Sequence, residues 1–267
     1  PDFSIFKRGL GKEDLEQLRE TILMLQRFKG MPTFDWMSEL VVKLEDRLDL
    51  RGVSKSVVGY DENRTYTGLE WFQDLFDAII NKAVLHIQYK TFADITYDWT
   101  IHPYYIKEYN NRWFLFGLNE EQNSIYNIPL DRIWDLEQIQ KKYIPSSIDF
   151  ETYFDDVVGV SVFPGKKEPI RLQFSEHRFP YVTTKAIHQS QHILDYENRI
   201  VEISVVPNNE LEALILSFGK DVEVLAPDTF RKQIQIVIRE SYEKYCPVQI
   251  DCTGAPYLCI DEKTKGE

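Results

Sequence analysis

The stretch IHPYYIKEYNNRWFLFGL, residues 101–118, decides how the middle of the chain folds. Its two halves are rich in Ile, Tyr, Phe and Trp, which are residues that favour extended strands. Asn110 and Asn111 lie between the halves, and asparagine tolerates the positive φ that a tight hairpin turn requires. The sequence therefore predicts an antiparallel hairpin with strands at 101–108 and 112–118.

The same strand-forming composition extends over residues 83–138, where turn-forming residues recur at about the eight-to-twelve-residue spacing of antiparallel sheets. This spacing predicts several short antiparallel strands that close into a small barrel or sandwich. We expect five strands, near 84–90, 96–107, 112–118, 124–130 and 132–138.

The residues before this region read as helices. Apolar residues recur at spacings of three and four in 12–29 and in 34–49, which predicts two amphipathic helices. A third helix is expected from Trp71 to about residue 82, because Thr67 and Glu70 before it have the spacing of a capping box. We interpret this first third as a helical subdomain or a dimer contact.

The last third alternates between strand and helix patterns. Pro145-Ser146-Ser147 marks a linker before it, and residues 247–267 read as a loose tail. The resulting order, β-α-β-β-α-β and then a helix, is that of a split-βαβ or ferredoxin-like plan. Strands are expected near 169–174, 187–195, 199–206 and 221–225, a mixed stretch at 175–184, and helices at 210–218 and 228–245.

The sequence as a whole thus predicts an α+β protein of several parts. They are a helical connector (1–82), a small β-barrel (83–144), a ferredoxin-like domain with a C-terminal helix (164–246) and a tail (247–267). A length of 267 residues fits about two domains.

Composition narrows the possible functions. With 43% hydrophobic and 28% charged residues, the chain is globular, and no apolar run or signal peptide points to a membrane or to export. The three cysteines lie at 246, 252 and 259, which is no disulfide framework, so we expect a cytoplasmic location. The net charge of −12 argues against tight non-specific binding of duplex DNA, because neutralising phosphates requires basic residues.

Motifs for catalysis are missing from the sequence. It has no phosphate-binding glycine loop, no paired-histidine zinc motif and no nucleophile elbow. His188 and His192 are four residues apart, but that segment reads as a strand, so we expect no metal site. We predict no enzymatic activity and no cofactor.

One constellation does suggest chemistry. Aromatic rings alternate with cationic side chains on neighbouring strands of the predicted barrel, and such a surface suits a nucleotide or a single strand, since bases stack on rings and phosphates pair with cations. The candidate ligand-binding residues are Tyr89, Lys90, His102, Tyr104, Lys107, Arg112, Trp113 and Arg132.

Several alternatives remain open for these residues. Trp113 and Tyr104 are also compatible with the core, and Asp131 is a possible partner that neutralises Arg132. Strand alternation places His102 and Tyr104 on one face and Lys107 on the other, so not all eight residues fit one groove.

Three sequence blocks in this region resemble the WYL domain family. Trp113-Phe114-Leu115 matches the name-giving Trp-Tyr-Leu triplet, with Phe in place of Tyr. His102-Pro103-Tyr104-Tyr105 precedes it and Leu130-Asp131-Arg132-Ile133 follows it, in the family's order and spacing. Residues 169–245, which include Val222-Glu223-Val224-Leu225-Ala226-Pro227, resemble the C-terminal extension that commonly follows this domain.

The resemblance implies a bacterial transcriptional regulator. Such proteins carry an Sm- or SH3-like WYL barrel that senses a ligand, usually dimerise, and usually bind DNA through an N-terminal winged helix-turn-helix. Residues 1–82 hold 12 basic and 15 acidic residues, a net charge of −3, and show no basic recognition helix. We therefore expect operator DNA to be bound by a domain upstream of Pro1.

The leading hypothesis is thus the ligand-sensing and dimerisation region of a regulator, with a nucleotide or single-stranded nucleic acid on the barrel. The alternative is a protein–protein interaction module without a nucleic-acid ligand, in which the exposed aromatics anchor a partner. An aromatic patch without neighbouring cations would favour this alternative.

Overall fold

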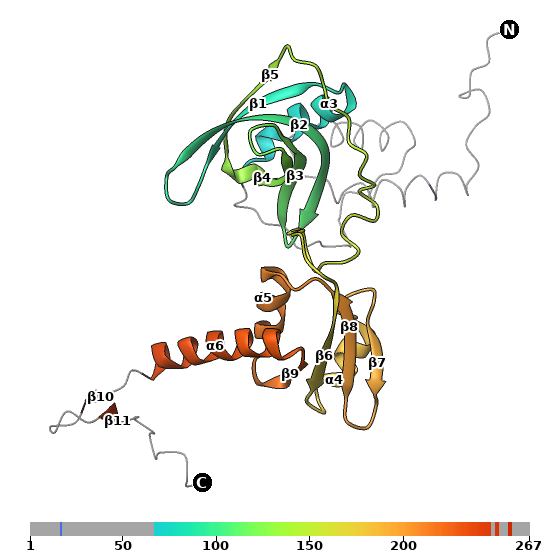
Figure 1. The fold of residues 1–267 in the computed structure, drawn as a ribbon, viewed down its shortest axis with the longest axis vertical. Helices are drawn as coiled ribbons and strands as arrows, with labels where there is room; N and C mark the ends of the chain where they lie inside the picture. The colour runs from blue at the N-terminus through green and yellow to red at the C-terminus, as the bar shows by residue number, and fades with distance from the viewer. Residues whose placement is uncertain (1–16, 18–66, 247–248, 251–255, 258–267) are drawn as a thin grey trace, which may run out of the picture. The chain divides into compact units, whose positions relative to one another are not determined.

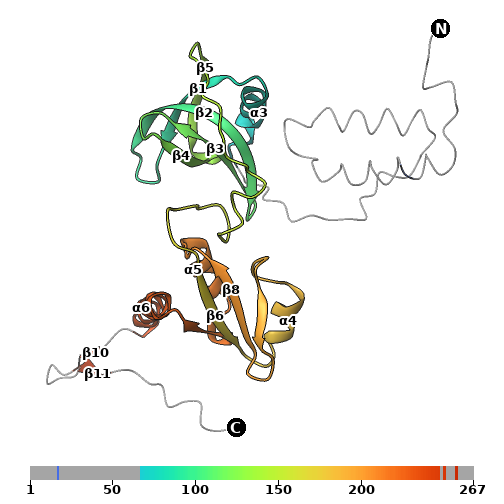
Figure 2. The same ribbon diagram turned by 45° about the vertical axis from the view of Figure 1, so that its right-hand side comes forward.

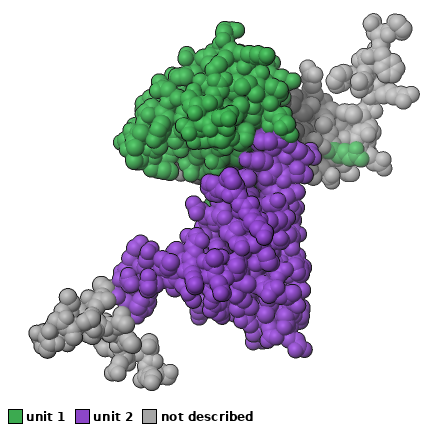
Figure 3. Space-filling view, viewed as in Figure 1, with its two compact units in different colours: residues 1–147 green, residues 148–267 purple. Residues whose placement is uncertain are grey.

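The computed structural model describes residues 17, 67–246, 249–250 and 256–257. The chain divides into two compact units, with the boundary between Ser147 and Ile148 (Figure 3). Each unit contains its own antiparallel sheet, and the fold is mixed α/β with few helices. The helices predicted at 12–29 and 34–49 lie outside the described residues except for Gln17, which is helical.

The first unit is built on a five-stranded antiparallel sheet with the order β4-β3-β2-β1-β5 (Figures 1 and 2). Each strand lies within two residues of its predicted position, because β-branched and aromatic residues mark the strands and polar turns separate them. The strands are β1 (Val84–Lys90), β2 (Thr96–Tyr109), β3 (Arg112–Asn119), β4 (Ser124–Pro129) and β5 (Ile133–Ile139).

The predicted hairpin between β2 and β3 is confirmed. Tyr109 pairs with Arg112, and Asn110 and Asn111 take φ values of 51° and 57°. These are the left-handed conformations that a two-residue hairpin turn needs and that asparagine tolerates better than most residues.

The long strand β2 serves two neighbours. It pairs with β1 through residues 96–101 and with β3 through residues 101–109. A β-bulge between Pro103 and Tyr105 interrupts the β3 register just past this changeover, and bulges bend strands. Gly117 lies opposite Pro103, where a Cβ atom would meet the His102 carbonyl oxygen at 2.6 Å. The bulge also interrupts the simple alternation expected for side chains 102 to 107.

The closed barrel that the sequence suggested is not confirmed. Strands β4 and β5 stand at the two ends of the sheet order, and among the described residues no ladder joins them. The pattern of strands and turns predicts how many strands form, but closure depends on strand tilt and shear across the whole sheet.

A single helix packs on this sheet. A 3-10 turn (Leu69–Trp71) leads into α3 (Phe72–Ile80), whose buried residues join strand residues such as Leu85 and Leu115 in one core. The predicted capping box is not formed, because the Glu70 carboxylate accepts the N–H of Gly68 at 2.8 Å instead. Gly68 has φ +96° and approaches the Leu130–Asp131 backbone so closely that a Cβ would lie 2.4 Å from it.

The second unit has a four-stranded antiparallel sheet with the order β7-β8-β6-β9. Its element order is the predicted β-α-β-β-α-β followed by a helix, while the finer description as ferredoxin-like stays a prediction. The elements are β6 (Glu168–Phe174), α4 (Phe179–Thr184), β7 (His192–Asp195), β8 (Ile200–Val205), α5 (Asn209–Ser217), β9 (Val222–Ala226) and α6 (Asp228–Tyr245).

Strand β7 is shorter than the predicted 187–195. Side chains take up the backbone groups that would otherwise extend the ladder: Gln191 accepts the N–H of Ile187 and donates to the carbonyl of Val182. Ser190 likewise accepts the N–H of Ser204. Local side-chain bonds of this kind compete with strand pairing.

The helices of the second unit close its core. Asn208 caps α5 by accepting the N–H of Leu211 at 2.9 Å, as the sequence predicts for a helix start. Helix α6 buries Phe230 and Ile234, while Ile238 further along it is exposed. Two short strands, β10 (Gln249–Ile250) and β11 (Pro256–Tyr257), pair within the predicted tail. Among the described residues no helix is long and apolar enough to cross a membrane.

Candidate functional site

Two predicted cations share one carboxylate at the end of the first sheet. Arg112 begins β3, and Asp131 and Arg132 lie in the 3-10 turn Leu130–Arg132 between β4 and β5. Arg112 binds Asp131 in bidentate fashion, with Nε–Oδ1 at 2.9 Å and Nη2–Oδ2 at 2.8 Å. Arg132 Nε lies 3.9 Å from the same Oδ2, which is too far for a hydrogen bond. We call these three residues the arginine cluster.

The arginine cluster carries a net positive charge, because one carboxylate faces two guanidinium groups. Arg112 occupies both oxygens of Asp131, so Arg132 is only partly neutralised. Its side chain is about four-fifths buried, with an exposed fraction of 21%. Its Nε is fully buried and has no hydrogen-bond partner among the described residues. The guanidinium therefore keeps much of its positive charge, and its exposed fifth is the part that an anion is able to reach.

The ring of Phe92, which is not among the eight predicted residues, covers Arg132. The Phe92 ring centroid lies 3.0 Å from the guanidinium carbon of Arg132 and 5.8 Å from that of Arg112. Such contacts fall within the range of cation–π attraction. Phe92 lies in the loop between β1 and β2, and 79% of its surface is exposed.

A stack of three rings lies on β1 and β2, which we call the ring stack. Tyr89 and Trp99 are stacked at 4.5 Å and Trp99 and Tyr97 at 5.7 Å, with interplanar angles of 19° and 17°. Tyr126 of β4 meets Trp99 edge-on at 5.2 Å. Tyr97 at one end of the stack is 44% exposed.

Tyr89 links the ring stack to the arginine cluster. Burial raises the pKa of the Tyr89 hydroxyl, and the positive charges of Arg132 and Arg112 partly oppose this rise. Tyr89 also pairs with Ile133, the residue after Arg132, in the β1–β5 ladder.

Lys90, Trp113 and Lys107, on β1, β3 and β2, have different surroundings. Lys90 follows Tyr89, so alternation directs it to the opposite face, where it pairs with Asp94 at 3.2 Å and lies 5.0 Å from the Trp134 ring. Trp113 meets the Phe72 ring of α3 edge-on at 5.0 Å and packs on the core. Lys107 lies opposite Phe114 in the β2–β3 ladder.

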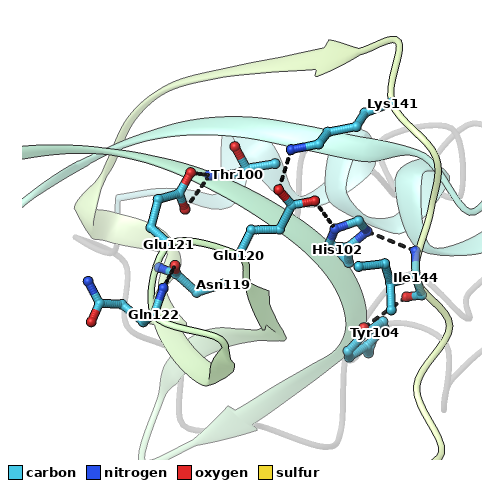
Figure 4. Close-up of polar contacts among 9 residues, drawn as sticks. All are labelled: Thr100, His102, Tyr104, Asn119, Glu120, Glu121, Gln122, Lys141 and Ile144. Atoms are coloured by element: carbon cyan, nitrogen blue, oxygen red, sulfur yellow. Dashed lines mark hydrogen bonds and ion pairs between the residues drawn. The ribbon is translucent and has the colours of Figure 1, made fainter.

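His102 and Tyr104 hold the segment that follows β5 (Figure 4). His102 is fully buried, and its Nδ1 accepts the N–H of Ile144 at 3.0 Å. Its Nε2 therefore carries the proton and donates to Glu120 at 2.8 Å. Tyr104 donates to the carbonyl of Ile144 at 2.8 Å. Since both ring nitrogens are used inside the protein, we leave His102 out of the candidate site.

Glu120 joins this group from the turn between β3 and β4. Its second oxygen accepts a hydrogen bond from Lys141, also visible in Figure 4, and Tyr143 donates to the carbonyl of Pro103 at 2.7 Å. The bonds from Lys141 and then His102 lower the pKa of the Glu120 carboxyl. Burial and the nearby Tyr143 raise the pKa of Tyr104 to about 12. We call the contacts of residues 141–144 with His102, Pro103, Tyr104 and Glu120 the clasp.

The sequence carried weak signals for the residues that were missed. Tyr97 and Trp99 alternate in the predicted strand 96–107, the pattern of two rings on one face. Phe92 is a large apolar residue in a turn, Thr91-Phe92-Ala93-Asp94, where polar residues are usual. Neither pattern predicts the contact with Arg132, because that contact joins residues 40 positions apart in sequence.

The structure thus brings together three of the eight predicted residues: Arg112, Arg132 and Tyr89. Around them stand Asp131, Phe92 and the rest of the ring stack. A cationic cluster beside flat rings is able to hold an anionic group and an aromatic group of one ligand at the same time.

Comparison with known families gives two matches. Residues 70–138 match the WYL domain, and residues 166–242 match the WCX domain. The first match includes α3, all five strands of the first sheet except the last residue of β5, and the whole arginine cluster. The second covers the strands of the second sheet and most of α6. No curated protein matches the chain.

Two solved structures are similar to the chain at 14% sequence identity. One is the proteasome accessory factor B/C (PafBC) of Arthrobacter aurescens, with 87% of this chain and 36% of that chain covered and a TM-score of 0.31. The chain thus spans about a third of the length of that protein. The other is a CRISPR Cas-related protein, with 90% and 75% covered and a TM-score of 0.46.

Proposed function

Since the chain is a WYL-domain protein of the regulator type, in which a WCX domain follows the WYL domain, we propose that its first sheet binds a nucleotide or a short single strand of nucleic acid. In this proposal the arginine cluster takes a phosphate, and the neighbouring rings take the bases. The chain then acts as the ligand-sensing and dimerisation region of a transcriptional regulator, without enzymatic activity.

One observation supports the ligand class most directly. Arg132 keeps much of its charge because Arg112 already occupies both oxygens of the only carboxylate that pairs with it among the described residues. A phosphate oxygen is a strong acceptor for a guanidinium donor. The ring stack supplies planar faces on which a base of any sequence can stack.

The finer fold descriptions belong to this proposal as well. The strand order β4-β3-β2-β1-β5 with a bent β2 is compatible with an Sm- or SH3-like barrel, and the second sheet with a ferredoxin-like fold. In the regulator, ligand binding would favour one arrangement of a dimer and so change the DNA affinity of an additional domain. Sedimentation equilibrium with and without oligonucleotide tests the dimer; a monomer under both conditions would contradict it.

The ligand proposal is tested by fluorescence anisotropy with a labelled oligothymidylate. The variant Arg132→Ala is expected to weaken binding and to reduce its salt dependence, because one phosphate contact on a single strand contributes about 0.7 to the slope of log K against log salt. Unchanged affinity and slope in this variant would contradict the proposed site.

Arg178 in the second unit provides a matched control. Its Nε is also buried and has no hydrogen-bond partner in the described part of the chain. Its Nη2 lies 3.8 Å from Asp221 Oδ2, and its guanidinium packs on the rings of Tyr181 and Phe218. Arg178→Ala removes the same charge from a similar environment outside the WYL domain. We expect it to bind oligothymidylate as the unaltered protein does, and an equal loss in both variants would place binding elsewhere.

The alternative function, a protein-interaction module, requires an aromatic patch without neighbouring cations. The exposed Phe92 ring has the guanidinium groups of Arg112 and Arg132 next to it. This surrounding supports the nucleotide over a protein partner.

A further inference from the structure

Phe92 is the most exposed large apolar side chain near the arginine cluster. Its ring contacts the guanidinium of Arg132 at 3.0 Å, yet 79% of its surface remains exposed. One face of the ring is therefore occupied by a cation, and the remaining surface meets water. Exposure of such an aromatic surface to water is unfavourable, so a ligand that covers the ring gains binding free energy.

The loop holds Phe92 in place by bonds that do not involve its ring. The N–H of Thr91 donates to the carbonyl of Ile95 at 2.9 Å, and the N–H of Ile95 donates to the Thr91 hydroxyl at 3.1 Å. Asp94, with φ of 60°, donates its N–H to the Thr91 carbonyl and pairs with Lys90. The loop is thus preorganised, so the ring need not move for a ligand to stack on it.

The charge beside the ring selects the kind of group that covers it. The guanidinium carbons of Arg132 and Arg112 lie 3.0 Å and 5.8 Å from the centre of the Phe92 ring, and Asp131 pairs with Arg112. With two positive groups and one negative group, the net charge next to Phe92 is positive. A purely apolar partner would desolvate this charge without compensation. A planar aromatic group that carries an anionic substituent satisfies both the ring and the cations.

We propose that Phe92 is a binding residue of the site, a platform on which one base of the ligand stacks while its phosphate pairs with the arginine cluster. This inference rests on the proposed function, and it adds a residue outside the three sequence blocks that resemble the family. It also predicts a column of Arg132, Phe92 and base, with the cation on the inner side of the ring.

The test measures affinities for two labelled probes of equal length, an oligothymidylate of about eight nucleotides and the corresponding abasic oligomer. Phe92→Ala is expected to weaken oligothymidylate binding by about fivefold to a hundredfold, the usual effect of one lost stacking ring. Its affinity for the abasic probe should stay unchanged, because that probe has no base to stack. Arg132→Ala should weaken both, and Phe92→Trp should preserve binding of oligothymidylate.

Trp134→Ala is the matched control, since Trp134 of β5 is also an exposed ring next to a cation, but that cation is Lys90 of β1 and not an arginine of the cluster. We expect it to bind both probes normally. If Arg132→Ala weakens binding and Phe92→Ala does not, or binds more tightly, the platform is wrong and the proposed function stands. If neither probe binds the unaltered protein, or Arg132→Ala has no effect, the proposed function and the platform both fail.

Discussion

A single carboxylate shared between two arginines defines the site at the scale of residues. Arg112 takes Asp131 in the bidentate geometry that is strongest for this pair, and Arg132 is left at 3.9 Å. Asp131 therefore neutralises the charge of Arg132 only in part. The pairing leaves a net positive charge on the arginine cluster, which is the charge that the proposed phosphate contact requires.

Gly117 of β3 lies so close to the backbone of β2 at His102 that we expect a larger residue at this position to destabilise the sheet. A Cβ at 117 would lie 2.6 Å from the His102 carbonyl oxygen and 2.7 Å from a methyl carbon of Ile101. Because backbone must shift to relieve the clash, we expect Gly117→Ala to lower the free energy of unfolding by about 1–3 kcal/mol. Urea denaturation measures this; an unchanged midpoint would show that the bulge tolerates a methyl group.

In the clasp, the buried His102 ring connects β2 to the segment that follows β5. The Ile144 N–H has the His102 ring as its acceptor, so His102→Phe leaves it without one. We expect hydrogen exchange at the Ile144 amide to become up to about tenfold faster, since a net hydrogen bond contributes roughly 0.5–1.5 kcal/mol. Tyr104→Phe, which removes only the bond to the Ile144 carbonyl, is the control. The Ile144 amide should exchange more slowly in this variant than in His102→Phe. Equal exchange in all three proteins would rule out the clasp.

Acid should loosen the clasp through Glu120. Bonds from Lys141 and His102 lower the pKa of this carboxyl below its ordinary 4.5, so its ionised form stabilises the folded protein. This contribution is present above pH 4.5 and disappears as the pH falls through the lowered pKa. In unfolding midpoints measured from pH 7 to 3, the difference between the unaltered protein and Glu120→Gln should therefore shrink below pH 4.5. Lys141→Met should behave similarly, and a constant difference at all pH values would contradict this assignment.

Two separate cores organise the molecule as a whole. The core of the first unit includes Leu75, Ile87 and Leu115, and that of the second includes Ile170 and Ile234, with no residue in common. Each sheet therefore buries its apolar face on its own helices, so the free energy of unfolding of one unit depends mainly on its own core.

This separation predicts different responses by two spectroscopic probes. All five tryptophans lie at positions 36, 71, 99, 113 and 134, in the first unit. We expect Ile234→Ala to lower the free energy of unfolding of the second unit by about 2–5 kcal/mol, because it leaves a cavity. Circular dichroism should report the loss, while tryptophan fluorescence should keep its midpoint. Ile238→Ala, at an exposed position of the same helix, should change neither; a joint shift of both probes in Ile234→Ala would show one cooperative unit.

Local patterns of residues account for most of the helices and strands and for their order along the chain. The strands of both sheets, apart from the shortened β7, appear where composition and periodicity predict them, as do the Asn110-Asn111 turn and the helix at 228–245, because these features depend on residues close together in the chain. The resemblance to the WYL family likewise rests on short local blocks, and the family match confirms it.

Which side chains come into contact depends on how the strands are arranged in three dimensions. His102 is buried and accepts the N–H of Ile144, 42 positions later in the chain, and the turn after β4 brings Arg132 to Phe92, 40 positions earlier. Closure of the first sheet into a barrel also depends on this arrangement, and the predicted closed barrel is not confirmed. Such pairings depend on strand register and bending over the whole sheet, and these are non-local properties that no pattern of neighbouring residues encodes.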